Sequence, residues 1–241
     1  MDKEKEIAEL KRQLQQTKDA LELFAYTVSH DMREPVRMVK SFMDLLMKKY
    51  SDSLNEKAKS YISYASDGAE RADLMIQDLL FYYRAVRNMQ STNADLNIAF
   101  AGASGKLKRK LESRNGIISC PILPVVQGDV DGIQEVFIYL FDHLLFHVPL
   151  DEQPRLQIEA KQADDKWEIT CAGNGPDPAP GELNDLFRLF HNRSQQLTAD
   201  STLNKLAVAK RMIEHLNGEL KAGQAAGGGI FFSITIPSVN G

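Results

Sequence analysis

The residue with the clearest potential for chemistry is His30, which is followed directly by Asp31 and closely by Arg33, Glu34 and Pro35. An imidazole beside a carboxylate suits phosphoryl transfer through nitrogen, because the carboxylate can take the ring proton or fix the tautomer. The other ring nitrogen then keeps the lone pair that attacks phosphorus. A lone exposed histidine is more often a solvated surface residue, so this interpretation depends on the surrounding sequence.

Two further pairs of residues have types that could bind a metal. His143 and His147 lie four residues apart on one predicted helix face, a spacing used by some metal sites. The sequence offers no third ligand, so we expect no metal and a pair of packed interior side chains. Cys120 and Cys171 lack the close spacing that a zinc site needs. Two buried free thiols are favoured over a disulfide.

The helix that positions His30 begins with a regular heptad seam. Its members are separated by alternating steps of three and four residues, with one polar member: Ile7, Leu10, Leu14, Thr17, Leu21, Phe24 and Val28. Such a seam, with charged residues and glutamines between its members, favours pairing with another helix. A single amphipathic helix that packs against its own chain is the alternative. The helix should continue to about Lys49 with a kink near Pro35, since proline removes a backbone donor.

A second helical pattern follows the break at Ser51–Asn55 and runs from Ala58 to Tyr83. Two long antiparallel helices joined by a short turn form a helical hairpin. A lone hairpin leaves an apolar face uncovered, so two copies are expected to pair into a four-helix bundle. The sequence therefore predicts a homodimer.

The composition of the chain changes after Val86. The segment Arg87–Asp95 is polar and predicts a linker. Beyond it, helical and strand-like patterns alternate, and a glycine turn joins two strands near the C-terminus. Helices grouped against a mostly antiparallel sheet form an α/β sandwich, so the whole chain is predicted to be α+β. The expected helices cover residues 99–113, 131–147 and about 202–216, and the expected strands cover 116–120, 155–160, 167–172 and two segments within 218–237.

The composition also excludes several classes of protein. Of the 241 residues, 43% are hydrophobic and 26% charged, which is typical of a folded globular protein. The net charge of −4 argues against a nucleic-acid partner, which normally meets a basic face. No apolar signal core opens the chain, and no window approaches the ~18–20 apolar residues that span a bilayer. We expect a cytoplasmic protein without its own membrane anchor.

The segments SHDMREPVRMV and DGAERADLMIQDLLFYYR resemble the dimerisation and phosphoacceptor domain of sensor histidine kinases, most closely the bacteriophytochrome-type group. The resemblance covers residues 23–88 and leaves residues 1–22 as the start of an N-terminal coiled-coil helix. It implies that His30 is the phosphorylated residue and that Asp31 is its acid/base neighbour. Glu34 takes the position where many such proteins carry a Thr or Asn that positions water, which makes hydrolysis of a partner's phosphate less expected.

Residues 94–241 resemble the ATP-binding domain of the same family in layout, through QGDVDGIQEVFIYLFDHLLFHV, WEITCAGNG, STLNKLAVAKRMIEHLNGELKA and IFFSITIP. The nucleotide-binding residues of the family are largely replaced. Its metal-ligand Asn falls on His143, and the earlier Asn of that helix falls on Tyr139. Its adenine-binding Asp falls on Gly173, whereas the glycine that follows is kept as Gly175.

The second glycine box of the family, which closes on phosphates, is replaced by Ser201, Leu203 and Lys205. Side chains there would obstruct the approach of the backbone to a phosphate, and an imidazole is a poor ligand for Mg²⁺. The resemblance with these replacements implies a degenerate domain that has lost ATP. We therefore expect no cofactor, with Mg²⁺ supplied by a partner receiver domain.

Three functions stay open from the sequence. The first is that of a dimeric histidine phosphotransferase built from a degenerate kinase core, which exchanges a phosphoryl group between His30 and response-regulator aspartates. The second is that of a non-catalytic pseudokinase that regulates a partner kinase or receiver. The third is that of an active sensor kinase with a divergent nucleotide pocket, or one module of a longer sensor. The expected partners are receiver domains, a second copy of the chain and a sensor kinase.

Overall fold

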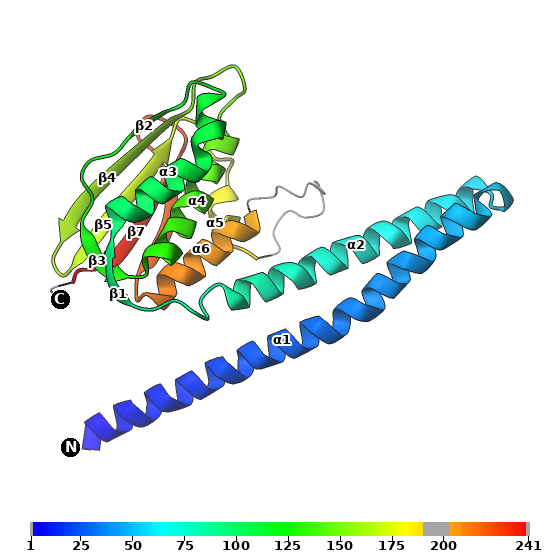
Figure 1. Cartoon of the computed structure of the whole chain (residues 1–241), viewed down its shortest axis with the longest axis horizontal. Coiled ribbons are helices and arrows are strands. Elements are labelled where there is room, and N and C mark those ends of the chain that lie inside the picture. Colours follow the sequence, from blue (N-terminus) through cyan, green and yellow to red (C-terminus); the bar gives the residue numbers. More distant parts are fainter. Residues whose placement is uncertain (1, 190–202, 240–241) are drawn as a thin grey trace. The chain divides into compact units, whose positions relative to one another are not determined.

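The chain divides into two compact units, Met1–Arg84 and Ala85–Gly241. The computed structural model describes residues 2–189 and 203–239. Figure 1 shows long helices in the first unit, and shorter helices beside a twisted sheet in the second. The α+β class predicted from the sequence is therefore confirmed.

The first unit is a helical hairpin. Helix α1 (Asp2–Tyr50) continues through Pro35, so the proline does not end the helix. A short 3-10 turn, η1 (Ser51–Ser53), leads to α2 (Glu56–Arg84). The side chain of Asn55 accepts a hydrogen bond from the N–H of Ala58 at 2.8 Å, which satisfies one of the free donors at the start of α2.

Small and apolar side chains form the contact between the two helices. Ala25 and Ser29 of α1 are buried, as are Ala69, Ile76 and Leu80 of α2. Their spacings of four or seven residues, about one or two helical turns, place them on one face of each helix. Polar contacts flank this face and fix the antiparallel register, because Lys40 Nζ lies 3.5 Å from Glu70 Oε2 and Ser66 donates to Asp44 at 3.1 Å.

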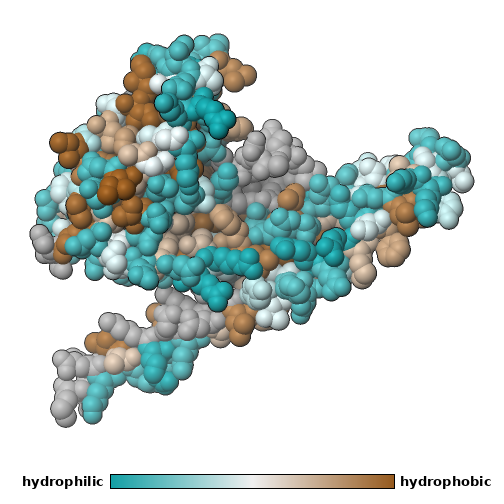
Figure 2. Space-filling model, viewed as in Figure 1, coloured by the Kyte–Doolittle hydropathy of each residue, from teal (hydrophilic) through white to brown (hydrophobic). Residues whose placement is uncertain are grey.

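The large residues of the heptad seam are exposed on the hairpin. Five of its large apolar side chains are between 51% and 63% exposed: Ile7, Leu10, Leu14, Leu21 and Phe24. Helix α1 does pack against α2 of its own chain, but through Ala25 and Ser29 rather than through these seam residues. Figure 2 shows apolar side chains exposed along the hairpin, and pairing with a second helix stays a prediction.

The second unit contains a five-stranded sheet with the strand order β2-β4-β5-β7-β6. Strands β2 and β4 are parallel, and the other neighbouring pairs are antiparallel. Its elements, in chain order, are β1 (Thr92–Asp95), α3 (Leu96–Glu112), β2 (Ile117–Ser119), β3 (Val125–Gly128), α4 (Val130–Phe146), β4 (Arg155–Ala163), β5 (Lys166–Gly173), α5 (Glu182–Asp185), α6 (Leu203–His215), β6 (Glu219–Gln224) and β7 (Ile230–Pro237).

The core of this unit lies between the sheet and its helices. Helix α4 packs against β4 and β5, α6 packs against β6, and α3 packs against α4. Because α4 is covered on several sides, it is apolar almost all round, and Phe137, Leu140 and Phe141 are fully buried. The sheet contributes alternate residues, such as Ile169 opposite Ile234. This architecture is the predicted α/β sandwich.

The predicted linker Arg87–Asp95 is wrong in its second half. Thr92–Asp95 forms β1, which pairs antiparallel with β3 and places Ala94 opposite Val126. Both of these side chains are fully buried, so the segment belongs to the core. Strand β3 and the short helix α5 were also not predicted, because four residues carry too little periodicity to identify.

Within residues 2–189 and 203–239, no helix combines the length and apolarity that crossing a membrane would require.

Candidate functional site

His30 lies on the exposed side of α1. Its neighbour Ser29 faces α2 and is 1% exposed, and successive helical residues are turned by about 100°, so His30 points away from that contact. The side chains of His30 and Asp31 are 73% and 72% exposed. The predicted exposure of this imidazole is therefore found, and it follows from the helical periodicity.

The carboxylate of Asp31 contacts the ring of His30. Nδ1 lies 3.1 Å from Oδ1 of Asp31, within hydrogen-bonding distance. When Nδ1 carries the proton and donates it to this carboxylate, Nε2 keeps its lone pair. This is the arrangement that nucleophilic attack by Nε2 on phosphorus requires.

Two charged residues follow one turn later on α1. Glu34 is exposed, and the structure gives no role to its carboxylate beyond its negative charge near His30. Arg33 is half-buried and its Nε lies 3.5 Å from Oδ1 of Asp73 on α2. The other oxygen of Asp73 accepts a hydrogen bond from Gln77 at 2.6 Å. Sequence reasoning missed Asp73, because its proximity to Arg33 depends on the register of the hairpin.

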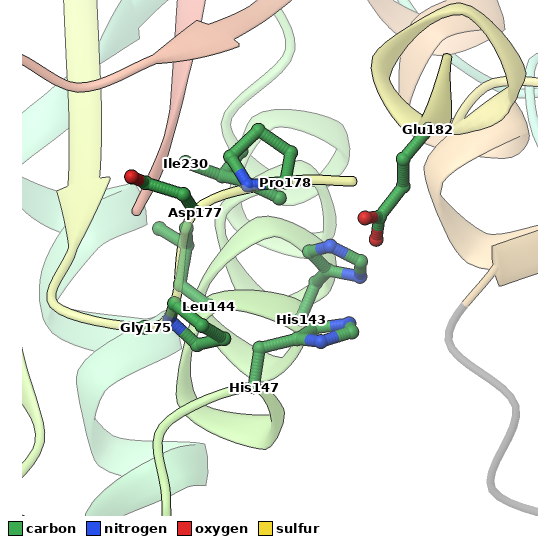
Figure 3. Close-up of a pocket in the computed structure, with 9 residues that line it drawn as sticks. His143, Leu144, His147, Gly175, Asp177, Pro178, Glu182 and Ile230 are labelled. Carbon is green, nitrogen blue, oxygen red and sulfur yellow. The ribbon is translucent and has the colours of Figure 1, made fainter. Parts of the chain in front are cut away.

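The second unit holds a small cavity of about 40 Å³ beside the C-terminal half of α4. Its lining includes His143 of α4, His147 directly after that helix, Gly175 and Asp177 from the segment after β5, and Glu182 of α5. Figure 3 shows the two imidazole rings side by side, with the carboxylate of Glu182 turned toward them. Of the four predicted degenerate positions, His143 and Gly175 line this cavity.

His143 is completely buried. Its ring centroid lies 4.4 Å from that of His147 and 5.6 Å from that of Phe232 on β7. Burial, together with the nearby charge of His147 when protonated, lowers the pKa of His143 to about 3. Burial also lowers the pKa of His147, although Glu182 opposes that change. Both imidazoles are therefore neutral at pH 7.

Tyr139 lies one turn before His143 on α4 and is 8% exposed. Burial and the charge of Glu135 raise the pKa of its hydroxyl. Gly173 ends β5, where an added Cβ would lie 3.1 Å from the side chain of Leu144. Tyr139 is thus buried, and Gly173 lies close to the side chain of Leu144 on α4.

The segment after β5 closes on the turn between β6 and β7. Asp177 Oδ1 accepts a hydrogen bond from the N–H of Gly229 at 2.9 Å. Gly229 has a φ of 81°, and a Cβ there would lie 2.7 Å from the carbonyl oxygen of Gly173. Only glycine fits this backbone. Sequence reasoning missed Asp177, whose partner lies 52 residues away.

The three residues that replace the family's second glycine box are Ser201, Leu203 and Lys205, and the structure describes them only in part. Ser201 lies outside the described residues, and so does the side chain of Leu203. Lys205 lies on α6 and is half-buried. In the part of the chain that the structure describes, no group of three or more His, Cys, Asp or Glu side chains is placed to hold a metal ion. Cys120 and Cys171 are both free thiols, as predicted, but only Cys171 is buried, and Cys120 is partly exposed.

Comparison with known proteins identifies both units. Residues 8–87 match the His Kinase A (phospho-acceptor) domain, and residues 128–240 match the family described as histidine kinase-, DNA gyrase B-, and HSP90-like ATPase. A phosphoacceptor hairpin followed by an ATPase-type sandwich is the core of a sensor kinase. The chain belongs to the sensor histidine kinase family of two-component signalling proteins.

Among similar proteins, the phytochrome-like protein Cph1 of Synechocystis sp. is 28% identical over 236 residues, which cover 98% of this chain and 31% of that protein. Sensor histidine kinase ZraS of Salmonella typhimurium is 23% identical, over 88% of this chain and 44% of its own. The chain thus spans about a third of the length of the first of these relatives and under half of the second.

Solved structures share the fold. Full-length ShkA in complex with AMPPNP superposes with a TM-score of 0.56 at 18% identity, covering 88% of this chain and 45% of that one. Histidine kinase ThkA in complex with response regulator protein TrrA gives a TM-score of 0.55 at 20% identity, covering 88% of this chain and 60% of that one.

Proposed function

We propose that this chain carries a phosphoryl group on His30 and exchanges it with aspartates of response-regulator receiver domains, without ATP as its donor. The observation that carries the proposal is the contrast between two histidines. The imidazole of His30 is exposed and hydrogen-bonded to Asp31. The imidazole of His143, at the position of the family's metal ligand, is buried in packing contacts.

The proposed step needs no nucleotide. The lone pair of Nε2 on His30 forms a bond to the phosphorus of an aspartyl phosphate, and the acyl P–O bond breaks. The aspartate carboxylate leaves with the electron pair, while the Nδ1 proton passes to Asp31 or to water. Transfer to the next receiver reverses these events. Catalysis then consists of in-line positioning and of charge neutralisation, to which the receiver contributes its Mg²⁺.

The proposed loss of ATP is supported by three features of the second unit. The cavity of about 40 Å³ beside α4 has room for a few water molecules, and two imidazoles line it. Magnesium prefers oxygen ligands, and a buried imidazole stands at the expected ligand position. The carboxylate of Glu182 faces the cavity and would repel a polyphosphate. These residues do not fit a magnesium nucleotide.

A second copy of the chain is the proposed partner of the hairpin. The exposed seam residues Leu14, Leu21 and Phe24 support this, because burial of apolar surface favours association by about 25 cal/mol per Å². Receiver domains are the other proposed partner. The solved complex of a related histidine kinase with a response regulator supports that choice.

The test is transfer of labelled phosphate to the wild-type chain, to His30→Ala and to His215→Ala. His215 is an exposed histidine on α6 and provides a matched control. Each protein is offered labelled ATP and, separately, phosphorylated receiver domains of the same organism. We expect label from receivers in the wild type and in His215→Ala, with a loss of at least 100-fold in His30→Ala. Equal labelling of His30→Ala would overturn the proposal.

Two other outcomes define the alternatives. Incorporation from ATP at His30 would make the chain an autokinase with a divergent pocket. No incorporation from either donor would favour a regulatory pseudokinase, a role for which exposed apolar residues of α1 such as Met38 and Phe42 provide a binding surface.

A further inference from the structure

Among the residues three or four positions from His30 along α1, Arg33 is the one cation. Of the four positions that lie three or four residues before or after His30, the others are Tyr26, Thr27 and Glu34. Side chains at such spacings share a helix face, with about 5–6 Å between their Cβ atoms. An arginine side chain is long enough to reach a group bound to His30 from there.

Arg33 is held loosely by Asp73. Its Nε lies 3.5 Å from Oδ1 of Asp73, and among the described residues this buried Nε has no hydrogen-bond partner. The side chain of Arg33 as a whole is 39% exposed. Asp73 keeps a second contact, since it accepts a hydrogen bond from Gln77. Separating Arg33 from Asp73 therefore leaves neither group isolated from polar partners or water.

The charges near His30 require a cation once a phosphate is present. Asp31, Glu34 and Asp73 are acidic, and Arg33 is the one base among them. A phosphoryl group on Nε2 would add between one and two further negative charges near pH 7, as protein-bound phosphates do. A guanidinium fork matches the spacing of phosphate oxygens and forms strong, charge-assisted hydrogen bonds with them.

We propose that Arg33 binds the oxygens of the phosphoryl group on His30, and that Asp73 holds the same guanidinium when His30 is unmodified. The inference rests on the proposed function, because it needs His30 to carry phosphate. The guanidinium of Arg33 then has two alternative partners. In the unmodified state Arg33 links α1 to α2, and in the phosphorylated state it contacts the phosphoryl group and leaves Asp73 to Gln77.

A small donor tests this without a receiver domain and without ATP. Phosphoramidate supplies its phosphoryl group directly to histidine. The lone pair of Nε2 forms the new N–P bond, the original P–N bond breaks, and ammonia leaves with the electron pair. The donor is an anion, so a cation beside His30 should speed the reaction.

The experiment follows labelling of the full chain by ³¹P NMR and then titrates the phosphohistidine signal with pH. The variants are Arg33→Ala, Arg33→Lys and Asp73→Asn. Arg37→Ala serves as a matched control, since Arg37 is the next cation along α1 but lies seven residues from His30, a rise of about 10 Å. The signal of His30 is assigned by its absence from His30→Ala, because the chain has other histidines.

We expect Arg33→Ala to slow labelling roughly fivefold and to raise the second pKa of the phosphoryl group by about half a unit. Arg33→Lys should recover part of both effects. Asp73→Asn should leave the labelling rate unchanged or faster, since it frees Arg33, and should not raise this pKa. Arg37→Ala should match the wild type in both measurements.

The outcomes separate the two proposals. An absent His30 signal in every protein would overturn the proposed function itself. A normal His30 signal whose pKa is the same in wild type and Arg33→Ala would overturn only the role of Arg33. Equal losses in Arg33→Ala and Asp73→Asn would also overturn it, because a merely structural ion pair predicts the same effect from either side.

Discussion

His30 and His143 both lie on long helices, but their surroundings differ in almost every respect. The side chain of His30 is 73% exposed and contacts a carboxylate. His143 is fully buried against the rings of His147 and Phe232. An imidazole in water can take up and release a group, whereas a buried neutral imidazole acts as a packing residue. The exposed histidine of the hairpin is thus the one placed for chemistry in the proposed function, whereas His143 contributes to the packing of the second unit.

The largest expected effect comes from truncating the buried histidine. His143→Ala should lower the free energy of unfolding of the second unit by about 3 kcal/mol, because it leaves a cavity among Phe232 and its neighbours. His30→Ala should change stability by less than about 0.5 kcal/mol. In urea, the fluorescence of Trp167, the single tryptophan, follows unfolding of the second unit, and far-UV circular dichroism follows the hairpin that carries His30. Similar losses of unfolding free energy in His143→Ala and His30→Ala would contradict the contrast between a packing histidine and an exposed one.

The second effect is a loss of stability in mild acid. His143 has a pKa of about 3 in the fold, against about 6.5 when unfolded. Between these values the unfolded chain binds more protons, so stability is full above pH 6.5 and falls as the pH decreases toward 3. We expect a loss of about 2 kcal/mol by pH 5 from His143 alone, with His147 adding to it.

The control for the acid effect is the packing variant His143→Leu, which should show a flatter dependence on pH than the wild type. His30→Leu should keep the wild-type slope, since His30 lies in the other unit. The measurement is urea unfolding of each protein at several values between pH 5 and 8. A slope that is the same in His143→Leu and wild type would show that other groups cause the loss.

A third prediction concerns Arg114, which holds the segment after α4 in place. Its guanidinium donates to the carbonyl oxygens of Val148 at 3.1 Å and Glu152 at 2.9 Å, and also to that of Pro149. Arg114→Ala should cost about 1–2 kcal/mol, because these acceptors lose a charged donor. Arg109→Ala is the control, since Arg109 is exposed on α3. Trp167 fluorescence in urea compares the two, and equal stabilities would argue against this role.

Much of the fold could be predicted because its signals are local. The hairpin, α3, α4 and the strands β4, β5 and β7 follow from apolar periodicity over eight or more residues. The pairing of His30 with Asp31 needed no knowledge of the fold, because the two are adjacent. The short strands β1 and β3 were missed, since each stabilises the other through pairing between residues about 30 positions apart. The contacts of Arg33 with Asp73 and of Asp177 with Gly229 likewise depend on register and loop closure, which a single sequence does not display.

The smallest expected effects come from ion pairs. They test whether charged groups, like the two histidines, are more buried and more strongly coupled in the second unit than in the hairpin. Lys110 Nζ lies 2.5 Å from Asp142, whose side chain is 19% exposed. Lys40 Nζ lies 3.5 Å from Glu70, whose side chain is 52% exposed, and also 3.9 Å from Asp44. Double-mutant cycles should give a coupling of about 1 kcal/mol for the first pair and below about 0.5 kcal/mol for the second.

The two couplings need different probes, because Trp167 reports on the second unit and the hairpin has no tryptophan. Far-UV circular dichroism in urea follows the hairpin, and each cycle combines alanine at both positions with the two single variants. Raising the salt concentration should weaken the pair of Lys40 and Glu70 more than that of Lys110 and Asp142, since exposed charges are screened more strongly. If the two pairs have equal coupling energies and equal salt dependence, the contrast in burial between His30 and His143 does not apply to the ion pairs of the two units.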